Sequence, residues 1–181
     1  MVSHDAPQSD ETSQGIVETP VGAITVTSDG RSIVRVAWRE ALPANTAVAD
    51  AVTGAAHDPL VTEALQQLRA YFDGTLHQFD LPLDLGEMSD VARAVLTTLE
   101  ATVASGITVT YGELAARSGT GIPARAIGSI MGMNPLPVVI PCHRVVASDG
   151  LGGYSGGAPG KGLETKRWLL EHEEALPLSL F

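Results

Sequence analysis

The chain of 181 residues has one cysteine, few aromatic side chains and no long apolar run. A single cysteine excludes an internal disulfide and predicts a reducing, cytoplasmic location. No apolar stretch approaches the roughly 18–20 residues needed to cross a bilayer, so no membrane association is expected. The first residues lack the basic start and apolar stretch of a secretory signal, and residues 1–14 are predicted to form a disordered leader.

Basic side chains are also scarce, and the formal net charge of −10 opposes binding to nucleic acid. The charge is unevenly distributed, however. Residues 1–85 hold 12 acidic and 4 basic side chains, whereas residues 86–181 hold 9 acidic and 7 basic ones. The second half therefore repels phosphate far less than the total suggests. It is still not a basic patch, so we expect modest, salt-dependent DNA affinity.

The first half of the chain has the pattern of a small antiparallel sheet followed by a helix. Segments 16–19, 23–28 and 33–39 are rich in Val, Ile and Thr and are separated by turn signals, which predicts three strands. Apolar residues at helical spacing predict a helix over 59–72. Residues 41–57 have no clear period and predict a loop with some helix, and 76–85 is predicted to be extended.

The second half is predominantly helical by the same criteria. A helix is predicted to begin after Ser89 and to close at Gly106, a second covers 111–118, a third 123–133, and a last one 163–174. The second and third are joined by a short turn containing glycine, which predicts a helix-turn-helix. Residues 138–140 are predicted to form a buried strand, and 150–162 a mobile loop.

The predicted fold class is therefore α+β, with a sheet-containing N-terminal domain over 15–85, a helical domain over 86–175 and a tail over 176–181. The helix predicted over 123–133 has two unlike faces: Ile127, Ile130 and Met131 lie on one side at helical spacing. The other side carries Arg125, Ala126, Gly128, Ser129, Gly132 and Met133. Apart from Arg125 and Met133, these residues have small side chains or none. Close packing against another helix and close approach to a DNA groove both explain that bare face, and spacing alone does not separate them.

The single cysteine, Cys142, lies in an apolar run over 135–146 with His143 beside it. A lone thiol with a neighbouring histidine is suited to nucleophilic catalysis. A thiol in an apolar pocket has a raised pKa and needs a base, but neighbours in an extended segment point to opposite faces. Contact therefore requires a bend or a bridging water. The acidic candidates to orient the histidine are Glu171, Glu173 and Glu174, and a buried structural cysteine is the alternative interpretation.

Six motifs in the second half resemble those of the O6-alkylguanine-DNA alkyltransferases, or methylated-DNA–protein-cysteine methyltransferases. Pro-Cys-His-Arg-Val-Val at 141–146 is similar to the active-site signature of that family, and Asn134-Pro135 precedes it. The remaining motifs lie at 110–115, 124–128, 153–157 and 166–173. The resemblance covers 86–174, with a weaker match before it. It implies a ribonuclease H-like N-terminal domain and a winged-helix-like helix-turn-helix.

The resemblance implies direct-reversal repair of double-stranded DNA that contains O6-alkylguanine, with O4-alkylthymine as a second candidate lesion. Cys142 would accept the alkyl group irreversibly, once per molecule and without a cofactor. His143 would withdraw the thiol proton through a water, and Glu173 would orient the histidine. Asn134 would brace the loop that holds the cysteine, and Tyr111 would donate a hydrogen bond or a proton to the leaving guanine.

The resemblance also implies residues that bind the lesion and the duplex. The backbone N–H of Ser155 would favour O6, and the carbonyls of Cys142 and Val145 would contact the amino group of the base. The remaining substrate-binding residues are Tyr154, Met131 and Gly156. Arg125 would fill the stack vacated by a flipped nucleotide. Ala126, Gly128, Ser129 and Gly132 would approach the minor groove.

The chain departs from the family pattern at several places. Met133 stands where relatives often carry a basic residue, and residues 158–161 resemble an insertion in the pocket loop. Some relatives hold a zinc ion with N-terminal cysteines. This chain has none there, so no metal is expected, and His4, His57 and His77 are predicted to be surface residues.

Three other functions are alternatives to alkyl transfer for a chain with one cysteine and a helix-turn-helix. A non-catalytic lesion reader would not need Cys142, and a cysteine-sensing DNA-binding regulator would need base-reading side chains that are few here. A cysteine hydrolase would need an oxyanion hole and turnover. The sequence therefore favours an alkyltransferase, and with the resemblance we expect a monomer in solution.

Overall fold

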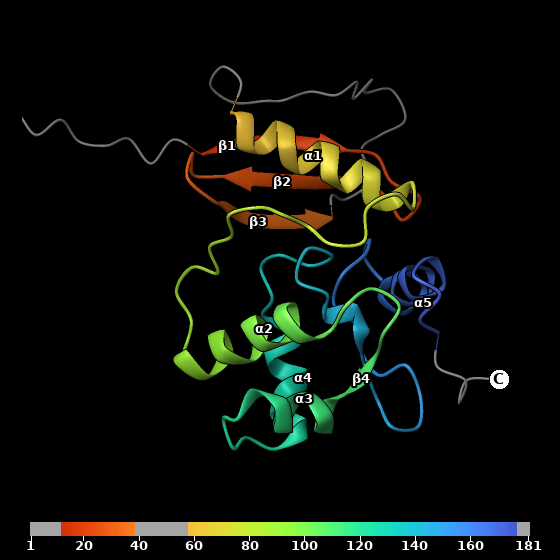
Figure 1. The fold of residues 1–181 in the computed structure, drawn as a ribbon. Coiled ribbons are helices and arrows are strands. Elements are labelled where there is room, and N and C mark those ends of the chain that lie inside the picture. Colours follow the sequence, from red (N-terminus) through yellow and green to blue (C-terminus); the bar gives the residue numbers. More distant parts are fainter. Residues whose placement is uncertain (1–11, 39–57, 177–181) are drawn as a thin grey trace, which may run out of the picture.

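The computed structural model describes residues 12–38 and 58–176 (Figure 1). Strands β1 (Ser13–Val17), β2 (Ile24–Ser28) and β3 (Ile33–Trp38) form an antiparallel sheet in the order β1-β2-β3. The predicted leader over 1–14 was too long, because Ser13 and Gln14 already pair with Ser28 and Thr27 of β2. Residues 1–11 of that leader lie outside the described residues, as does the segment 41–57.

Helix α1 (Pro59–Phe72) packs on the sheet and confirms the prediction for 59–72. The Asp58 carboxylate caps it by accepting a 2.8 Å hydrogen bond from the backbone N–H of Leu60.

The first strand, β1, begins earlier in the chain than predicted, because polar Ser13 and Gln14 give no β signal. Gly15 of β1 faces α1 so closely that a Cβ there would lie 2.6 Å from Cγ1 of Val61.

The second half holds the remaining helices (Figure 1). They are α2 (Asp90–Thr102), α3 (Tyr111–Ser118), α4 (Ala124–Gly132) and α5 (Gly162–His172), with a 3₁₀ turn η1 (Cys142–Arg144). Strands β4 (Val109–Thr110) and β5 (Val145–Val146) pair in parallel. Ser89 caps α2 as predicted, but α2 ends at Thr102, before Gly106, and α5 ends at His172, two residues earlier than expected.

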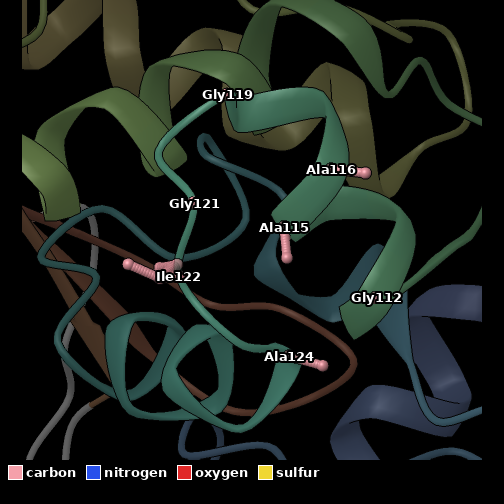
Figure 2. A pocket seen from close by; sticks show the side chains of 7 residues that line it. All are labelled: Gly112, Ala115, Ala116, Gly119, Gly121, Ile122 and Ala124. Carbon is pink, nitrogen blue, oxygen red and sulfur yellow. The ribbon is translucent and has the colours of Figure 1, made fainter.

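Helices α3 and α4 form the predicted helix-turn-helix. Thr110 and Glu113 make a capping box at the start of α3, and Gly119 ends it with a left-handed φ of 65°. A pocket of about 540 Å³ opens beside α3, the turn and the start of α4. Figure 2 shows the residues that line it. Its lining consists of small or apolar residues: Gly112, Ala115, Ala116, Gly119, Gly121, Ile122 and Ala124. Small side chains therefore leave this hollow open beside α3, the turn and the start of α4.

The strand predicted at 138–140 is wrong. Val138 has a left-handed φ of 74°, which a strand does not allow, and the backbone N–H of Ile140 donates to the carbonyl of Leu136 at 2.8 Å. The apolar run forms a turn because the Asn134 side chain bonds the backbone of Leu136 and Ile140. Local β propensity is overridden by this side-chain brace.

One cluster of buried apolar side chains runs through both halves of the molecule. It includes Val26 from the sheet, Leu68 from α1, Leu99 from α2, Ile127 from α4 and Leu169 from α5. The elements that carry the cysteine therefore rest on a core shared with the N-terminal sheet. Within residues 12–38 and 58–176, no helix has the length and apolar character needed to cross a membrane.

Candidate active site

Cys142 begins the turn η1 and is 4% exposed. It lies at a pocket of about 330 Å³ lined by groups from α3, α4 and the loop before α5. The other lining residues are Tyr111, Gly128, Met131, Gly132, Gly153, Tyr154 and Ser155. Burial raises the pKa of the thiol, while the Asn134 side chain and the charge of Lys166 act in the opposite direction. The cysteine is therefore a thiol until a base removes its proton.

Asn134 holds the turn that leads to the cysteine. Its side-chain nitrogen donates to the carbonyl of Ile140 at 2.9 Å, and its oxygen accepts from the backbone N–H of Leu136 at 3.0 Å. The same amide interacts with the Cys142 thiol. Asn134 is predicted to brace the loop that holds Cys142, and these hydrogen bonds are the contacts that such a role requires.

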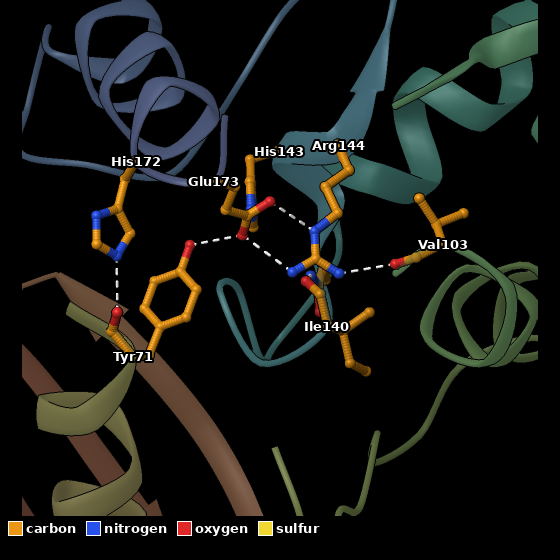
Figure 3. A network of polar contacts seen from close by, with 8 residues as sticks. Tyr71, Val103, Ile140, His143, Arg144, His172 and Glu173 are labelled. Carbon is orange, nitrogen blue, oxygen red and sulfur yellow. Dashed lines mark hydrogen bonds and ion pairs between the residues drawn. The ribbon is translucent and has the colours of Figure 1, made fainter. Parts of the chain in front are cut away.

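His143 is wholly buried, and its Nε2 lies 2.8 Å from Oε1 of Glu173 (Figure 3). An ionised carboxylate only accepts, so Nε2 carries the hydrogen and donates it. Burial lowers the pKa of His143 against the opposing effect of Glu173, which keeps the ring neutral. Nδ1 is then the basic nitrogen, and it is a buried atom without a hydrogen-bond partner among the described residues.

Glu173 is the centre of a larger network (Figure 3). Burial would raise its pKa, but contacts with His143 and Arg144 outweigh burial and lower it far below the ordinary value. Arg144 donates from Nε to Oε2 at 2.8 Å and from Nη2 to Oε1 at 2.9 Å. The Tyr71 hydroxyl donates to Oε1 at 2.7 Å. Of the three acidic candidates at the end of α5 and just beyond it, Glu173 is buried and meets the histidine, whereas Glu171 and Glu174 are exposed.

Two tyrosines line the pocket with different surroundings. Tyr111 is half-buried, and burial raises its pKa although a backbone contact at Gly153 opposes the change. Burial also raises the pKa of Tyr154, whose hydroxyl is enclosed and lacks a hydrogen-bond partner within the described part of the chain. Both side chains are therefore hydroxyls, able to donate, around neutral pH.

Sequence reasoning assigned no role to Lys166, whose side chain is fully buried on α5. Its Nζ donates to the carbonyl of Val145 at 2.6 Å and to the carbonyl of Gly153 at 2.9 Å. Burial lowers its pKa to about 8, and the nearby Cys142 opposes that shift. The lysine ties the strand after the cysteine to the loop that forms one wall of the pocket.

The predicted binding residues divide into three groups. Ser155, Tyr154 and Met131 line the pocket with Cys142, whereas Gly156 does not. Val145 is fully buried, and its carbonyl already accepts from Lys166.

The third group lies on α4. Arg125, Gly128, Ser129 and Gly132 are exposed and Ala126 is half-buried. A Cβ at Gly132 would meet no heavy atom within 4 Å, whereas one at Gly128 would lie 3.9 Å from Cε1 of Tyr111 on α3. The face is therefore open at Gly132 and approaches α3 at Gly128.

Sequence reasoning missed Tyr71, Arg144, Gly153 and Lys166. Arg144, Gly153 and Lys166 stand inside motifs quoted above, so the motifs were a signal for them. Tyr71 lies 102 residues from Glu173, and no local pattern signals the contact. Among residues 12–38 and 58–176, no group of three His, Cys, Asp or Glu side chains is placed to hold a metal ion.

Comparison with known proteins agrees with this geometry. Residues 90–175 match the family described as 6-O-methylguanine DNA methyltransferase, DNA binding domain, and residues 13–85 match its ribonuclease-like domain. A methylated-DNA–protein-cysteine methyltransferase of Mycolicibacterium paratuberculosis is 37% identical over 164 residues, which is 87% of this chain and 89% of that protein. One from Rattus norvegicus is 35% identical over 172 residues, covering 87% and 80% of the two chains.

Solved structures show the same fold. The Mycobacterium tuberculosis O6-methylguanine methyltransferase is 32% identical, with a TM-score of 0.71 over 93% of this chain and 97% of that one. A structure of the protein from that organism in complex with DNA is 34% identical, with a TM-score of 0.72 over 92% and 96% of the two chains. The predicted α+β fold class and the resemblance read from the motifs are confirmed. The chain belongs to the 6-O-methylguanine DNA methyltransferase family.

Proposed function

We propose that the protein repairs double-stranded DNA by transferring the alkyl group of O6-alkylguanine to Cys142. The observation that carries this proposal is the thiol at a pocket of about 330 Å³, with the His143–Glu173 pair buried beside it. That volume falls within the range of small-ligand pockets. The names of the relatives and the DNA-bound structure of one of them support the same activity.

The reaction is a displacement at carbon. The Cys142 thiol gives its proton to Nδ1 of His143, through a bridging water if the two do not meet directly, and the thiolate attacks the alkyl carbon. The new C–S bond forms as the C–O6 bond breaks, and guanine leaves with the electron pair. Tyr111 donates a hydrogen bond or proton to that anion. A thioether does not hydrolyse, so each molecule reacts once.

Glu173 supports the proton transfer by stabilising the imidazolium that forms at His143. The substrate base is extruded from the duplex into the pocket, which costs a few kcal/mol. Arg125, exposed at the start of α4, occupies the vacated stack, and the bare α4 face approaches the minor groove. The base is bounded by Tyr154, Met131 and the backbone at Ser155. A reduced thiol is required, which accords with a reducing, cytoplasmic location. We propose further that the protein acts as a monomer.

The test is the mass of the intact protein after incubation with a duplex oligonucleotide that contains O6-methylguanine. We expect one added methylene mass on Cys142 and an equal loss of lesion. The matched control is Cys142→Ser, which keeps the shape of the side chain and should gain no mass. Lesion binding without transfer by the wild type would instead support the lesion reader. Lesion loss that exceeds one per protein would support turnover.

A further inference from the structure

The end of α1 meets the end of α5 at two polar contacts (Figure 3). The hydroxyl of Tyr71, which is 2% exposed, donates to Oε1 of Glu173 at 2.7 Å. The Nε2 of His172 lies 2.7 Å from the carbonyl oxygen of Tyr71. A carbonyl only accepts, so Nε2 of His172 carries the hydrogen. The two contacts fix the Tyr71 ring and backbone beside the carboxylate.

The oxygen that Tyr71 contacts is the one that His143 uses. Oε1 of Glu173 accepts from the Tyr71 hydroxyl, from Nε2 of His143 at 2.8 Å and from Nη2 of Arg144 at 2.9 Å. Hydrogen bonds to a charged group are roughly twice as strong as neutral ones. The Tyr71 hydroxyl therefore competes with His143 for the negative charge on Oε1, which stabilises the imidazolium when His143 takes up a proton.

We propose that Tyr71 is a positioning residue of the transfer reaction, whose hydroxyl holds the Glu173 carboxylate and sets the basicity of His143. This inference rests on the proposed function. It goes beyond it by giving the N-terminal sheet-and-helix half of the chain a functional group in the site. Tyr71 is not among the residues that line the Cys142 pocket, and its hydroxyl donates to Glu173, so it acts through Glu173.

Several other titratable groups face this cluster. Arg144 comes from η1, Lys166 and His172 from α5, and Tyr154 from the loop before α5. The charges of Arg144 and Lys166 both lower the pKa of His143. Burial and the charge of Glu173 raise the pKa of Tyr71 far above the ordinary value, so it remains a hydroxyl donor across the pH range of the reaction.

The direction of the effect follows from the shared oxygen. Tyr71→Phe keeps the ring and its packing against Phe72, Phe79 and His172 but removes the donor. Oε1 then offers more negative charge to His143. We expect the pKa of His143 to rise by about half a unit, a roughly threefold change in its protonation equilibrium. The acid limb of the transfer rate should move to higher pH by the same amount.

The experiment is an NMR titration of the His143 ring in the wild type and in Tyr71→Phe, followed by single-turnover rates across the same pH range. The matched control is Thr75→Val, which removes a hydroxyl that donates to the carbonyl of Ala70 just beyond α1 and does not reach Glu173. The control should leave the His143 titration unchanged. In the wild type, the Tyr71 hydroxyl proton should exchange slowly and shift as His143 titrates, an observation that needs no variant.

Each outcome decides a separate question. An unchanged His143 titration in Tyr71→Phe, or a Tyr71 hydroxyl signal insensitive to His143, overturns the inference. An equal shift in Thr75→Val also overturns it, because the effect would then come from general loosening of the helix end. A wild type that shows the expected titration but transfers no alkyl group contradicts the proposed function and leaves the coupling of Tyr71 to His143 intact.

Discussion

Arg144 and Glu173 form a two-point ion pair in the interior of the protein, with Nε 2.8 Å from Oε2 and Nη2 2.9 Å from Oε1. Both side chains are buried. The negative charge of Glu173 is therefore balanced by Arg144 before His143 takes up a proton. This arrangement keeps the histidine neutral in the resting protein, while its hydrogen bond to the carboxylate fixes which ring nitrogen is basic.

Glu173→Gln should lower both stability and transfer rate. The substitution leaves Arg144 buried without a counter-charge, and breaking a buried pair from one side costs about 3–5 kcal/mol. We expect the free energy of unfolding in urea to fall by that amount. The single-turnover rate should also fall, because an amide stabilises an imidazolium less than a carboxylate does.

The control for this prediction removes the second charge as well. Arg144→Met combined with Glu173→Gln should recover part of the lost stability, since no unpaired charge remains buried. A double variant as unstable as the sum of the two single variants would show that the pair contributes nothing through its mutual attraction. The transfer rate should stay low in the double variant, because its carboxylate is still missing.

Acid should destabilise the folded protein through the same cluster. The pKa of His143 is lowered in the folded state, so the unfolded chain binds the proton first as pH falls below the ordinary value of 6.5. The pKa of Glu173 is also lowered, so its contribution is present above 4.5 and is lost as pH falls further. Both groups make the free energy of unfolding decrease with falling pH.

Urea unfolding followed from about pH 7 down to about pH 5, above the range in which the Glu173 contribution is lost, measures the His143 part of this effect. We expect a continuous decrease in the free energy of unfolding over that interval. Stability that stays constant would mean that folding does not lower the pKa of His143, and stability that rises would mean that folding raises it. Either result would contradict a histidine that burial keeps neutral.

Local signals were sufficient for most of the fold. Asp58 and Ser89 side chains cap α1 and α2, and the apolar spacing of both helices agrees with their buried faces. The failure at 138–140 has a local cause too, because the three apolar residues have strand propensity but Val138 adopts a left-handed φ. The Asn134 side chain imposes that turn, and propensity alone does not weigh such a brace.

The candidate site was only partly predictable, since its network joins distant segments. The motifs indicated Cys142 and His143, and the resemblance selected Glu173 from three acidic neighbours. Contact between Tyr71 and Glu173 depends on how α1 packs against the end of α5, which no spacing in the sequence records. The motifs therefore indicated the reacting groups and contained Arg144, whereas the donor Tyr71 is visible only in the structure.

Gly162→Ala should destabilise the protein although alanine normally favours a helix. Gly162 is the first residue of α5, and a Cβ there would overlap the carbonyl oxygen of Tyr154 and meet that of Gly156. Because backbone must move, we expect a loss of about 1–3 kcal/mol and a slower transfer rate as Tyr154 shifts.

Gly150→Ala is the matched control for that substitution. A Cβ at Gly150 would meet nothing within 4 Å, and its φ is not in the left-handed region. Thermal unfolding and single-turnover rates of the two variants should therefore differ, with Gly150→Ala close to wild type. Equal behaviour would mean that the loop before α5 adjusts freely and that its approach to Gly162 does not shape the pocket.

Arg125→Ala should slow transfer from duplex DNA more than transfer from a single strand. Arg125 is exposed at the start of α4, outside the pocket lining, so its removal leaves the reacting groups in place. A lesion in a single strand needs little unstacking, whereas a duplex lesion must be held out of the helix. We expect a rate about tenfold lower on the duplex and little change on the single strand.

Arg167→Ala on α5 is the matched control, because it makes the same charge change at another exposed position. It should affect neither substrate selectively. Equal slowing of both substrates by Arg125→Ala would assign this arginine to general phosphate attraction instead of to the vacated stack.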